Sequence, residues 1–267
     1  MAKRQKVRKK EAVAPVPAGG ISILPLEGLP EVRKGNDLAK LIEAAARRAE
    51  TPLAHGDVVV VAQKIVSKAE GCLVQLSRVR PSAAARTLGK QMRHDPRFVQ
   101  VVLSETRRIV RESPHVLVVE THHGLVCANA GVDRSNVPGR DVVSLLPKDP
   151  DASAKRLRTA LRKRTGKRVA VIISDTFGRA WRLGLVEVAI GAAGLPVLTD
   201  LRGSRDRTGK QLHATILAVA DELAAAAGLR MGKADGVPVV IIRGHAFAAA
   251  DEPAAKIIRP AREDLFR

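Results

Sequence analysis

Short apolar runs recur along the chain and predict strands. Val58–Ala62 is a continuous β-branched run that follows the turn residues Gly56 and Asp57, and Val116–Glu120 and Val169–Ser174 have a similar character. Such runs are typical of strands that are buried on both faces. Weaker runs predict further strands at Ile21–Pro25, Gly124–Ala130, Leu195–Thr199 and Val237–Arg243.

Segments with helical spacing separate these runs. Apolar residues recur at helical intervals from Leu38 to Ala45, and Asp37 can cap the N-terminus of a helix over Asp37–Ala49. Because predicted strands and helices alternate throughout, we expect an α/β fold. The other predicted helices are the basic stretch 82–112, the basic amphipathic Ala152–Arg164, the small apolar and buried Gly184–Ala193, and an Ala-rich helix from about Ala214 to Ala227.

The two ends of the chain differ from its body. Residues 1–20 join a basic start to the Pro- and Gly-rich stretch Ala12–Gly20, and we interpret them as a disordered basic tail and linker. No apolar segment follows the basic residues as in a secretory signal, and no stretch approaches the roughly 18 apolar residues of a membrane span. We expect one functional domain over 21–250 and a C-terminal extension over 251–267.

The composition adds a strong positive charge. The chain has 46 Lys and Arg against 27 Asp and Glu, a formal net charge of +19 that favours an anionic partner. Aromatic residues make up only 2%, so few platforms exist on which single-stranded nucleic acid could stack. The two cysteines, Cys72 and Cys127, form neither a disulfide framework nor a CxxC pair, which fits a reducing cytoplasm.

Polar clusters follow three of the predicted strands, and ligands of α/β sheets usually bind at the carboxyl ends of strands. In the first cluster, Gln63, Lys64, Ser67 and Lys68 could hold phosphate oxygens, although a solvated lysine pair would look the same. No GxxxxGK[ST] P-loop is present. The sequence alone leaves both interpretations of this cluster open.

The second and third clusters are rich in oxygen ligands. Asn129–Asn136 offers Asp and Asn oxygens of the kind that Mg²⁺ or Mn²⁺ prefers, and a loop of Asx turns is the alternative. In Ser174–Arg179, a carboxylate and a hydroxyl follow an apolar strand, as in many phosphoryl-transfer sites, and a helix cap is the alternative. A fourth polar segment, Gly203–Gln211, could close over a ligand. The adjacent His122 and His123 would point to opposite faces of a strand, so we do not expect them to share a metal.

Taken together, four segments resemble one family. LPLEGLPEV (24–32), QKIVSKAEG (63–71), ETHHGLVCANAGVDRSNV (120–137) and SDTFGRAWRLG (174–184) resemble the coenzyme F420-0:L-glutamate ligases in order and separation. The resemblance runs from about Ile21 to Ala246. It implies a two-lobed α/β fold, an intertwined homodimer, and an amide ligase that uses GTP to join L-glutamate to the lactyl carboxylate of F420-0, a deazaflavin, with further γ-linked glutamates in some cases.

The resemblance also implies which residues form the site. Contacts to GTP are implied for Leu29, Pro30, Glu31, Val32, Gln63, Lys68 and Asn136. Asp133 and Asp175 are implied as catalytic metal ligands, with Thr176 and Gln211 on the side of a second metal. The metals would be Mg²⁺ or Mn²⁺, with a role for K⁺ also allowed. Gln63 and Gln211 depart from the family pattern, in which the first is commonly Ser and the second often Glu.

The chemistry of the residues agrees with that resemblance. GTP, glutamate and the phosphodiester-bearing acceptor are all anions, so a basic cleft with two metals would offset their repulsion. This accounts for the positive charge without nucleic acid or a membrane. Two alternatives are a basic nucleic-acid-binding protein, which would leave the oxygen-rich clusters unexplained, and an amide ligase for a different phosphorylated carboxylate.

Overall fold

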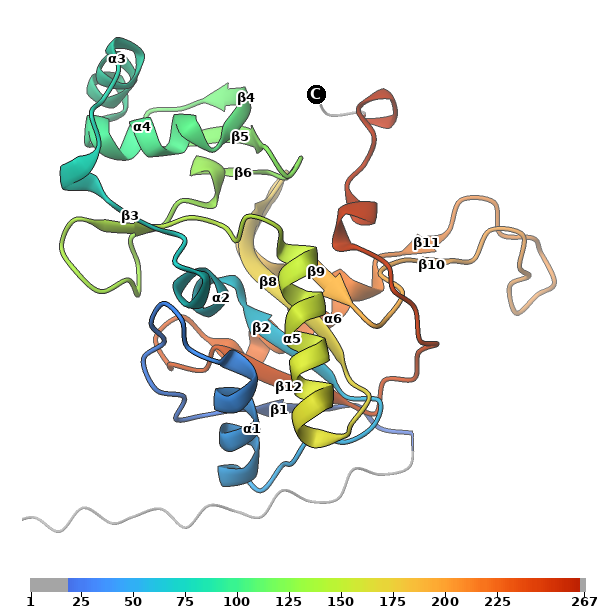
Figure 1. The fold of residues 1–267 in the computed structure, drawn as a ribbon. Helices are drawn as coiled ribbons and strands as arrows, with labels where there is room; N and C mark the ends of the chain where they lie inside the picture. The colour runs from blue at the N-terminus through green and yellow to red at the C-terminus, as the bar shows by residue number, and fades with distance from the viewer. Residues whose placement is uncertain (1–18, 265–267) are drawn as a thin grey trace, which may run out of the picture.

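A five-stranded sheet lies at the centre of the computed structural model, which describes residues 19–264 (Figure 1). The strands β2 and β8 are parallel, whereas every other neighbouring pair in this sheet is antiparallel. The prediction of an α/β fold is confirmed, and the predicted tail lies almost entirely outside the described residues. The order across the sheet is β1 (Ser22–Pro25), β12 (Val239–Arg243), β2 (Val58–Ala62), β8 (Ala170–Arg179) and β9 (Arg182–Ala193).

Helices cover both faces of the sheet. The helices α1 (Leu38–Arg48) and α5 (Pro150–Thr165) pack on one face, and α6 (Val219–Met231) packs on the other (Figure 1). Asp37 caps α1 as expected, because its Oδ1 accepts a hydrogen bond of 3.0 Å from the backbone N–H of Lys40. None of the described helices is long and apolar enough to cross a membrane.

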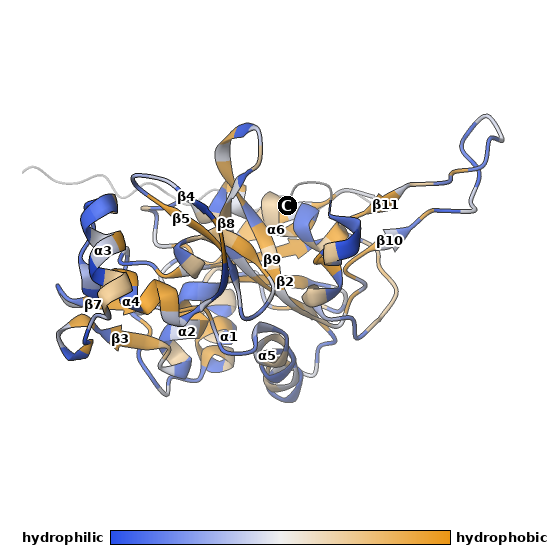
Figure 2. Cartoon of the chain, turned by 90° about the horizontal axis from the view of Figure 1, so that it is seen from above, coloured by the Kyte–Doolittle hydropathy of each residue, from blue (hydrophilic) through white to orange (hydrophobic). Residues whose placement is uncertain are grey.

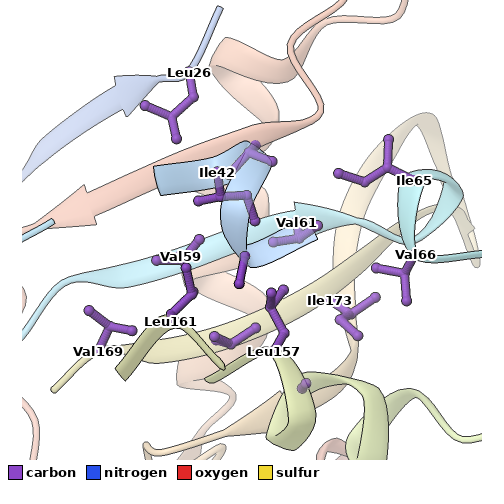
Figure 3. Close-up of a cluster of buried hydrophobic side chains, with 14 of the residues drawn as sticks. Leu26, Ile42, Val59, Val61, Ile65, Val66, Leu157, Leu161, Val169 and Ile173 are labelled. Carbon is purple, nitrogen blue, oxygen red and sulfur yellow. The ribbon is translucent and has the colours of Figure 1, made fainter. Parts of the chain in front are cut away.

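The continuous valine run of β2 fills the cores on both sides of the sheet. Val59 and Val61 pack in the cluster beneath α1 and α5, which Figure 3 draws, while Val58 and Val60 pack in the cluster beneath α6. All four side chains are fully buried. Because each such side chain contributes about 1.5–3 kcal/mol on burial, the run fixes the strand at the centre of the sheet.

A smaller unit with its own core lies beside the central sheet. It contains α3 (Ala83–Met92), α4 (Pro96–Ser104) and a sheet of β4 (Thr106–Glu112), β5 (Leu117–Thr121) and β6 (Val126–Ala128). The short ladder of β3 (Leu73–Gln75) and β7 (Val142–Ser144) connects it to the rest. The prediction of helix throughout 82–112 is wrong after Ser104, because the residues of β4 pair with β5.

The segment Gly184–Ala193 is a strand, not the buried helix that its small residues predicted. It belongs to β9, which pairs with β8 along the whole length of both strands. Small residues are needed there because α5 lies close to the strand: a Cβ placed on Gly191 would lie 2.4 Å from the carbonyl oxygen of Pro150. Helical propensity is therefore overridden by strand pairing and by close packing against α5.

An arm formed by residues 199–217 projects from the body of the molecule, and most of it is hydrophilic (Figures 1 and 2). At its base, β10 (Thr199–Asp200) pairs with β11 (Ile216–Leu217). The strand predicted over Leu195–Thr199 is therefore present only at its last residue. The predicted Ala-rich helix begins at Val219 instead of near Ala214.

The close approach at Gly191 gives a stability prediction. Gly191→Ala should lower the free energy of unfolding by about 2–3 kcal/mol, because the added methyl group would push β9 away from α5. Gly178→Ala is the matched control on the same hairpin, since no atom lies within 4 Å of its added Cβ. Urea unfolding of both variants tests this, and equal stabilities would contradict it.

Candidate functional site

Lys64 joins the first two polar clusters. It lies in α2 (Gln63–Glu70), which begins directly after β2 ends. Its Nζ donates hydrogen bonds to Asp133 Oδ2 at 2.6 Å and to Ser135 O and Oγ at 2.9 and 2.7 Å. The side chain of Lys64 is only 19% exposed and that of Asp133 is 44% exposed, so the lysine end of this ion pair is the one shielded from solvent. The first cluster is therefore no freely solvated lysine pair.

A tight turn and a backbone bridge hold Asp133 in place. Asn129, Ala130 and Gly131 have left-handed backbone with φ values of 50°, 56° and 70°, which reverses the chain after β6. Asp133 then exchanges backbone hydrogen bonds of 3.1 and 2.8 Å with Ser144. Burial acts to raise the pKa of Asp133, but hydrogen bonds from Lys64 and Ser135 outweigh it and lower the pKa below its ordinary value.

Asp175 lies inside β8, not at the strand end that the sequence predicted. The strand continues to Arg179, and Asp175 pairs with Val188 of β9. A helix cap at this position is thereby excluded, since no helix follows. Burial raises the pKa of Asp175 to about 6; the negative charge of Glu187 adds to that increase, while Thr176 N–H, Lys233 and Lys64 oppose it.

Glu187 is a component of the site that the sequence analysis missed. Its Oε2 accepts a hydrogen bond of 2.7 Å from Ser174 Oγ, and its Oε1 accepts one from Thr176 Oγ1. Thr176 Oγ1 is also 2.5 Å from Nζ of Lys233, a second residue that was missed. The sequence signal for Glu187 is that it is the single carboxylate within the apolar segment Gly184–Ala193. The prediction of a helix there gave no reason to place this carboxylate beside Ser174 and Thr176.

The residues expected to contact GTP lie around α2 and the loop before it. Lys68, which is buried, forms an ion pair of 2.6 Å with Glu31. Gln63, also buried, accepts a hydrogen bond of 2.8 Å from Ser67, and Asn136 Nδ2 lies 3.4 Å from the carbonyl oxygen of Lys233. In the preceding loop, Leu29 packs against the core beneath α1 and α5, Val32 is buried within it, and Pro30 is exposed.

Gln211 lies apart from the other expected metal ligands. It is exposed in the projecting arm, where it forms an isolated bridge with Arg205. Within residues 19–264 it makes no hydrogen bond with Asp133, Asp175 or Thr176. His122 and His123 also lie apart from these ligands: their Nε2 atoms contact the backbone oxygens of Ser104 and Pro147, respectively.

The donor atoms in this region fit a hard divalent cation. Asp133, Asp175 and Thr176 supply only oxygens, and burial beside Glu187 disfavours the ionised form of Asp175, a cost that a cation would relieve. Residues 19–264 of one chain nevertheless contain no group of three or more His, Cys, Asp or Glu side chains placed to hold a metal.

Comparison with known proteins shows the family to which the chain belongs. The family model of F420-0:Gamma-glutamyl ligase matches residues 28–244. The chain belongs to the F420-0:gamma-glutamyl ligase family. The match spans every candidate site residue from Leu29 to Gln211, and it agrees with the resemblance of the four sequence segments.

Relatives within the F420-0:gamma-glutamyl ligase family are similar along almost their whole length. A protein of Methanothermobacter thermautotrophicus is 46% identical over 251 residues, which are 93% of this chain and 99% of the relative. One of Methanopyrus kandleri is 48% identical over 93% of this chain and 100% of its own. One of Methanocaldococcus jannaschii is 43% identical over 88% and 92%, respectively. All three are named coenzyme F420:L-glutamate ligase.

The raised pKa of Asp175 predicts a pH-dependent stability for the metal-free protein. The folded state holds the proton of Asp175 more tightly than the unfolded state, so the contribution of this group to stability falls as pH rises from about 4 to 6. Asp175→Asn removes that cost. In a chelator, the variant should therefore gain about 1–3 kcal/mol over the wild type between pH 4 and 7, and the gain should level off above the folded-state pKa.

Urea unfolding across this pH range measures that gain. Asp200→Asn is a suitable control, because hydrogen bonds from Arg202 lower the pKa of Asp200 to about 2. Ionisation of Asp200 therefore stabilises the folded state, whereas ionisation of Asp175 destabilises it. A difference between Asp175→Asn and the wild type that stays constant with pH would contradict the assignment.

Proposed function

We propose that the protein is a GTP-dependent ligase that joins L-glutamate to the lactyl carboxylate of coenzyme F420-0. The observation that carries the proposal is the similarity of 43–48% to three proteins named coenzyme F420:L-glutamate ligase over nearly their whole length. The convergence of Lys64, Asp133 and Ser135 in one hydrogen-bonded group, with Asp175 beside Glu187, supports it. The addition of further γ-linked glutamates is compatible with the same chemistry.

The reaction requires that a carboxylate be activated. In the proposed mechanism, a carboxylate oxygen of the acceptor attacks the γ-phosphorus of GTP, and the bond to the β-phosphate oxygen breaks to release GDP. The glutamate amine then attacks the resulting acyl phosphate. Phosphate leaves, the nitrogen loses a proton, and an amide remains. The phosphoryl group is transferred between anions, so positive charge near it is the main need of the site.

Asp133 and Asp175 would hold one Mg²⁺ or Mn²⁺, and Thr176, which faces the opposite side of β8, would reach a second; both ions would supply positive charge to the phosphate oxygens. In the structure, Lys64 donates a hydrogen bond to Asp133 and Lys233 donates one to Thr176. On binding of the metal and nucleotide, these ammonium groups would become free to face phosphate oxygens. Each lysine would then have two roles: it donates a hydrogen bond to a proposed metal ligand, Asp133 or Thr176, before binding, and it contacts substrate afterwards.

The nucleotide would lie on the side of α2. Lys68 is released from Glu31 to contact a phosphate, while Gln63 and Asn136 supply neutral hydrogen-bonding groups. The loop residues Leu29, Pro30 and Val32, on either side of Glu31, would line the same pocket through their backbone and apolar surface. A lysine that is buried and paired in the free protein is well placed for this, because its position is already restrained before GTP binds.

We further propose that the protein is a homodimer in which the arm of one subunit completes the site of the other. Gln211 belongs to the arm of residues 199–217, which projects from the body of the molecule (Figure 1), and it bridges to Arg205 within that arm. Arg202, Arg205, Arg207 and Lys210 in the arm are all exposed. An arm that reached a second copy would add its cations and Gln211 to the incomplete set of ligands there.

Mass spectrometry of the products tests the proposed function. Incubation of the protein with F420-0, GTP, Mn²⁺ and glutamate should add one or more glutamate residues to F420-0 and release GDP and phosphate. Asp175→Asn should reduce turnover by about 10²-fold or more, because losing a charged ligand costs several kcal/mol of transition-state stabilisation. Unmodified F420-0 with the wild type, or full activity in a folded Asp175→Asn variant, would overturn the proposal.

Co-expression of two inactive variants tests the shared site. One subunit carries Asp175→Asn, and the other has residues 201–215 replaced by a short turn. If the arm acts across the dimer, mixed dimers have one complete site, and random pairing should restore about one quarter of the wild-type rate. If the arm acts within its own chain, no site is complete and the mixture stays inactive. Differently tagged subunits allow the mixed dimers to be isolated.

A further inference from the structure

A cavity of about 380 Å³ lies at the outer edge of β9, beyond the residues assigned to metal and nucleotide. One wall comes from the hairpin of β8 and β9, through Phe177, Val188 and Ile190. Leu125 contributes from the turn between β5 and β6, and Ile258 from the C-terminal segment. Its size falls within the range of small-molecule pockets, which are mostly apolar with a few polar groups.

The cavity lies next to the candidate metal site along two segments of the chain. On β8, Asp175 is followed at the same face by Phe177, which lines the cavity. At β6, which packs against β8, the buried Cys127 is preceded by Leu125, which also lines it. Two residues of a strand span about 6.6–6.8 Å, so a ligand in the cavity could extend a chain to Asp175.

We propose that this cavity binds the fused aromatic ring of the acceptor, with the lactyl carboxylate directed along β8 toward Asp175. This inference rests on the proposed function, because it locates one part of the substrate of that reaction. It assigns the C-terminal segment, which carries no recognised motif, as one wall of the acceptor site. The 3-10 turn Ala254–Ile257 is anchored there by hydrogen bonds of 2.7 and 3.4 Å from its first two backbone N–H groups to Asp151.

The other substrates fit the cavity poorly. Glutamate is small and carries two carboxylates, whereas the cavity is lined mainly by apolar side chains. Its charged lining has three carboxylates against one lysine, namely Asp149, Asp151, Asp221 and Lys148, beside His123. None of the residues assigned to GTP lines the cavity. The substrates carry two fused ring systems, the guanine of GTP and the larger deazaflavin of the acceptor. Because the residues assigned to GTP lie elsewhere, the deazaflavin is the ring that would gain from burial against these side chains.

Two polar groups in the cavity lining suit a ring with hydrogen-bonding edges. Asp221 accepts a hydrogen bond of 2.9 Å from Ala189 N through Oδ1, and its Oδ2 has no partner within residues 19–264, so that it can accept from the imide N–H of the ring. Nδ1 of His123 is buried and lacks a hydrogen-bond partner within the described residues. Buried polar atoms are seldom left unpaired, and a ligand edge is one way to satisfy this one.

Filling the cavity tests the assignment. Ile258→Trp should raise the KM for F420-0 at least tenfold and leave the KM values for GTP and glutamate within twofold, because only the ring is displaced. The neighbouring Arg259→Trp, at an exposed position that does not line the cavity, is the matched control and should behave as the wild type. Asp221→Asn, which preserves shape, should raise the KM for F420-0 about threefold to tenfold through the lost acceptor. Thermal melting identifies any variant that does not fold.

A binding measurement without turnover separates this inference from the proposed function. The fluorescence anisotropy of a deazaflavin that lacks the phosphate and lactyl groups should rise when wild-type protein or the Arg259→Trp variant is added. A tenfold higher concentration of the Ile258→Trp variant should be needed for the same rise. Equal binding by the folded Ile258→Trp variant, or a raised KM for GTP instead, would overturn the cavity assignment even if the ligase reaction is confirmed. Conversely, ring binding that Ile258→Trp weakens would support the cavity even if no glutamate is added.

Discussion

The pairing of β8 with β2 determines where the site can form. The two strands are parallel and remain paired through Ala62 and Ser174, the last residue pair of their ladder. At that point β2 ends and α2 begins, so Asp175 is the first residue of β8 that is no longer covered by β2. Lys64 emerges from the start of α2 on the same side and reaches Asp133. A parallel pair inside an otherwise antiparallel sheet thus brings two carboxyl ends of strands together, and α/β proteins usually bind ligands at such strand ends.

Beyond that point, β8 continues with β9 as its sole partner strand, which brings a second set of polar groups into register. Asp175 pairs with Val188, and Thr176 with Glu187. Successive residues of a strand face opposite sides, so Asp175 and Thr176 present their oxygens to different surroundings from adjacent positions. Asp175 faces the region of Lys64 and Cys127, and burial together with the charge of Asp175 raises the pKa of that cysteine thiol to about 12. Thr176 instead contacts Glu187 and Lys233.

Sequence alone could predict the elements that depend on local pattern. The fully buried strand β2 and the capped helix α1 follow directly from a β-branched run and from Asp37 before apolar residues at helical spacing. The strand β9 could not be predicted in this way, because its small residues are required by the close approach of Pro150 and by pairing with β8, both of which are tertiary contacts. That failure also concealed Glu187. The residues Asp133 and Asp175 were found from oxygen-rich motifs, whereas Lys233 lies in a segment with no motif and is brought to Thr176 by tertiary structure alone.

The protein's own charges treat the two carboxylates differently. Asp133 is stabilised as an anion because Lys64 and Ser135 donate to it, while Asp175 is disfavoured as an anion because it is poorly solvated and feels the negative charge of Glu187. One carboxylate is therefore neutralised by the protein, and the other is left with an unmet need for positive charge. Filling that need with lysine would stabilise the free protein but compete with a cation. Leaving it partly unmet lowers stability locally, and a cation at this position, as in the proposed function, would restore it; such a compromise between stability and function is common at functional sites.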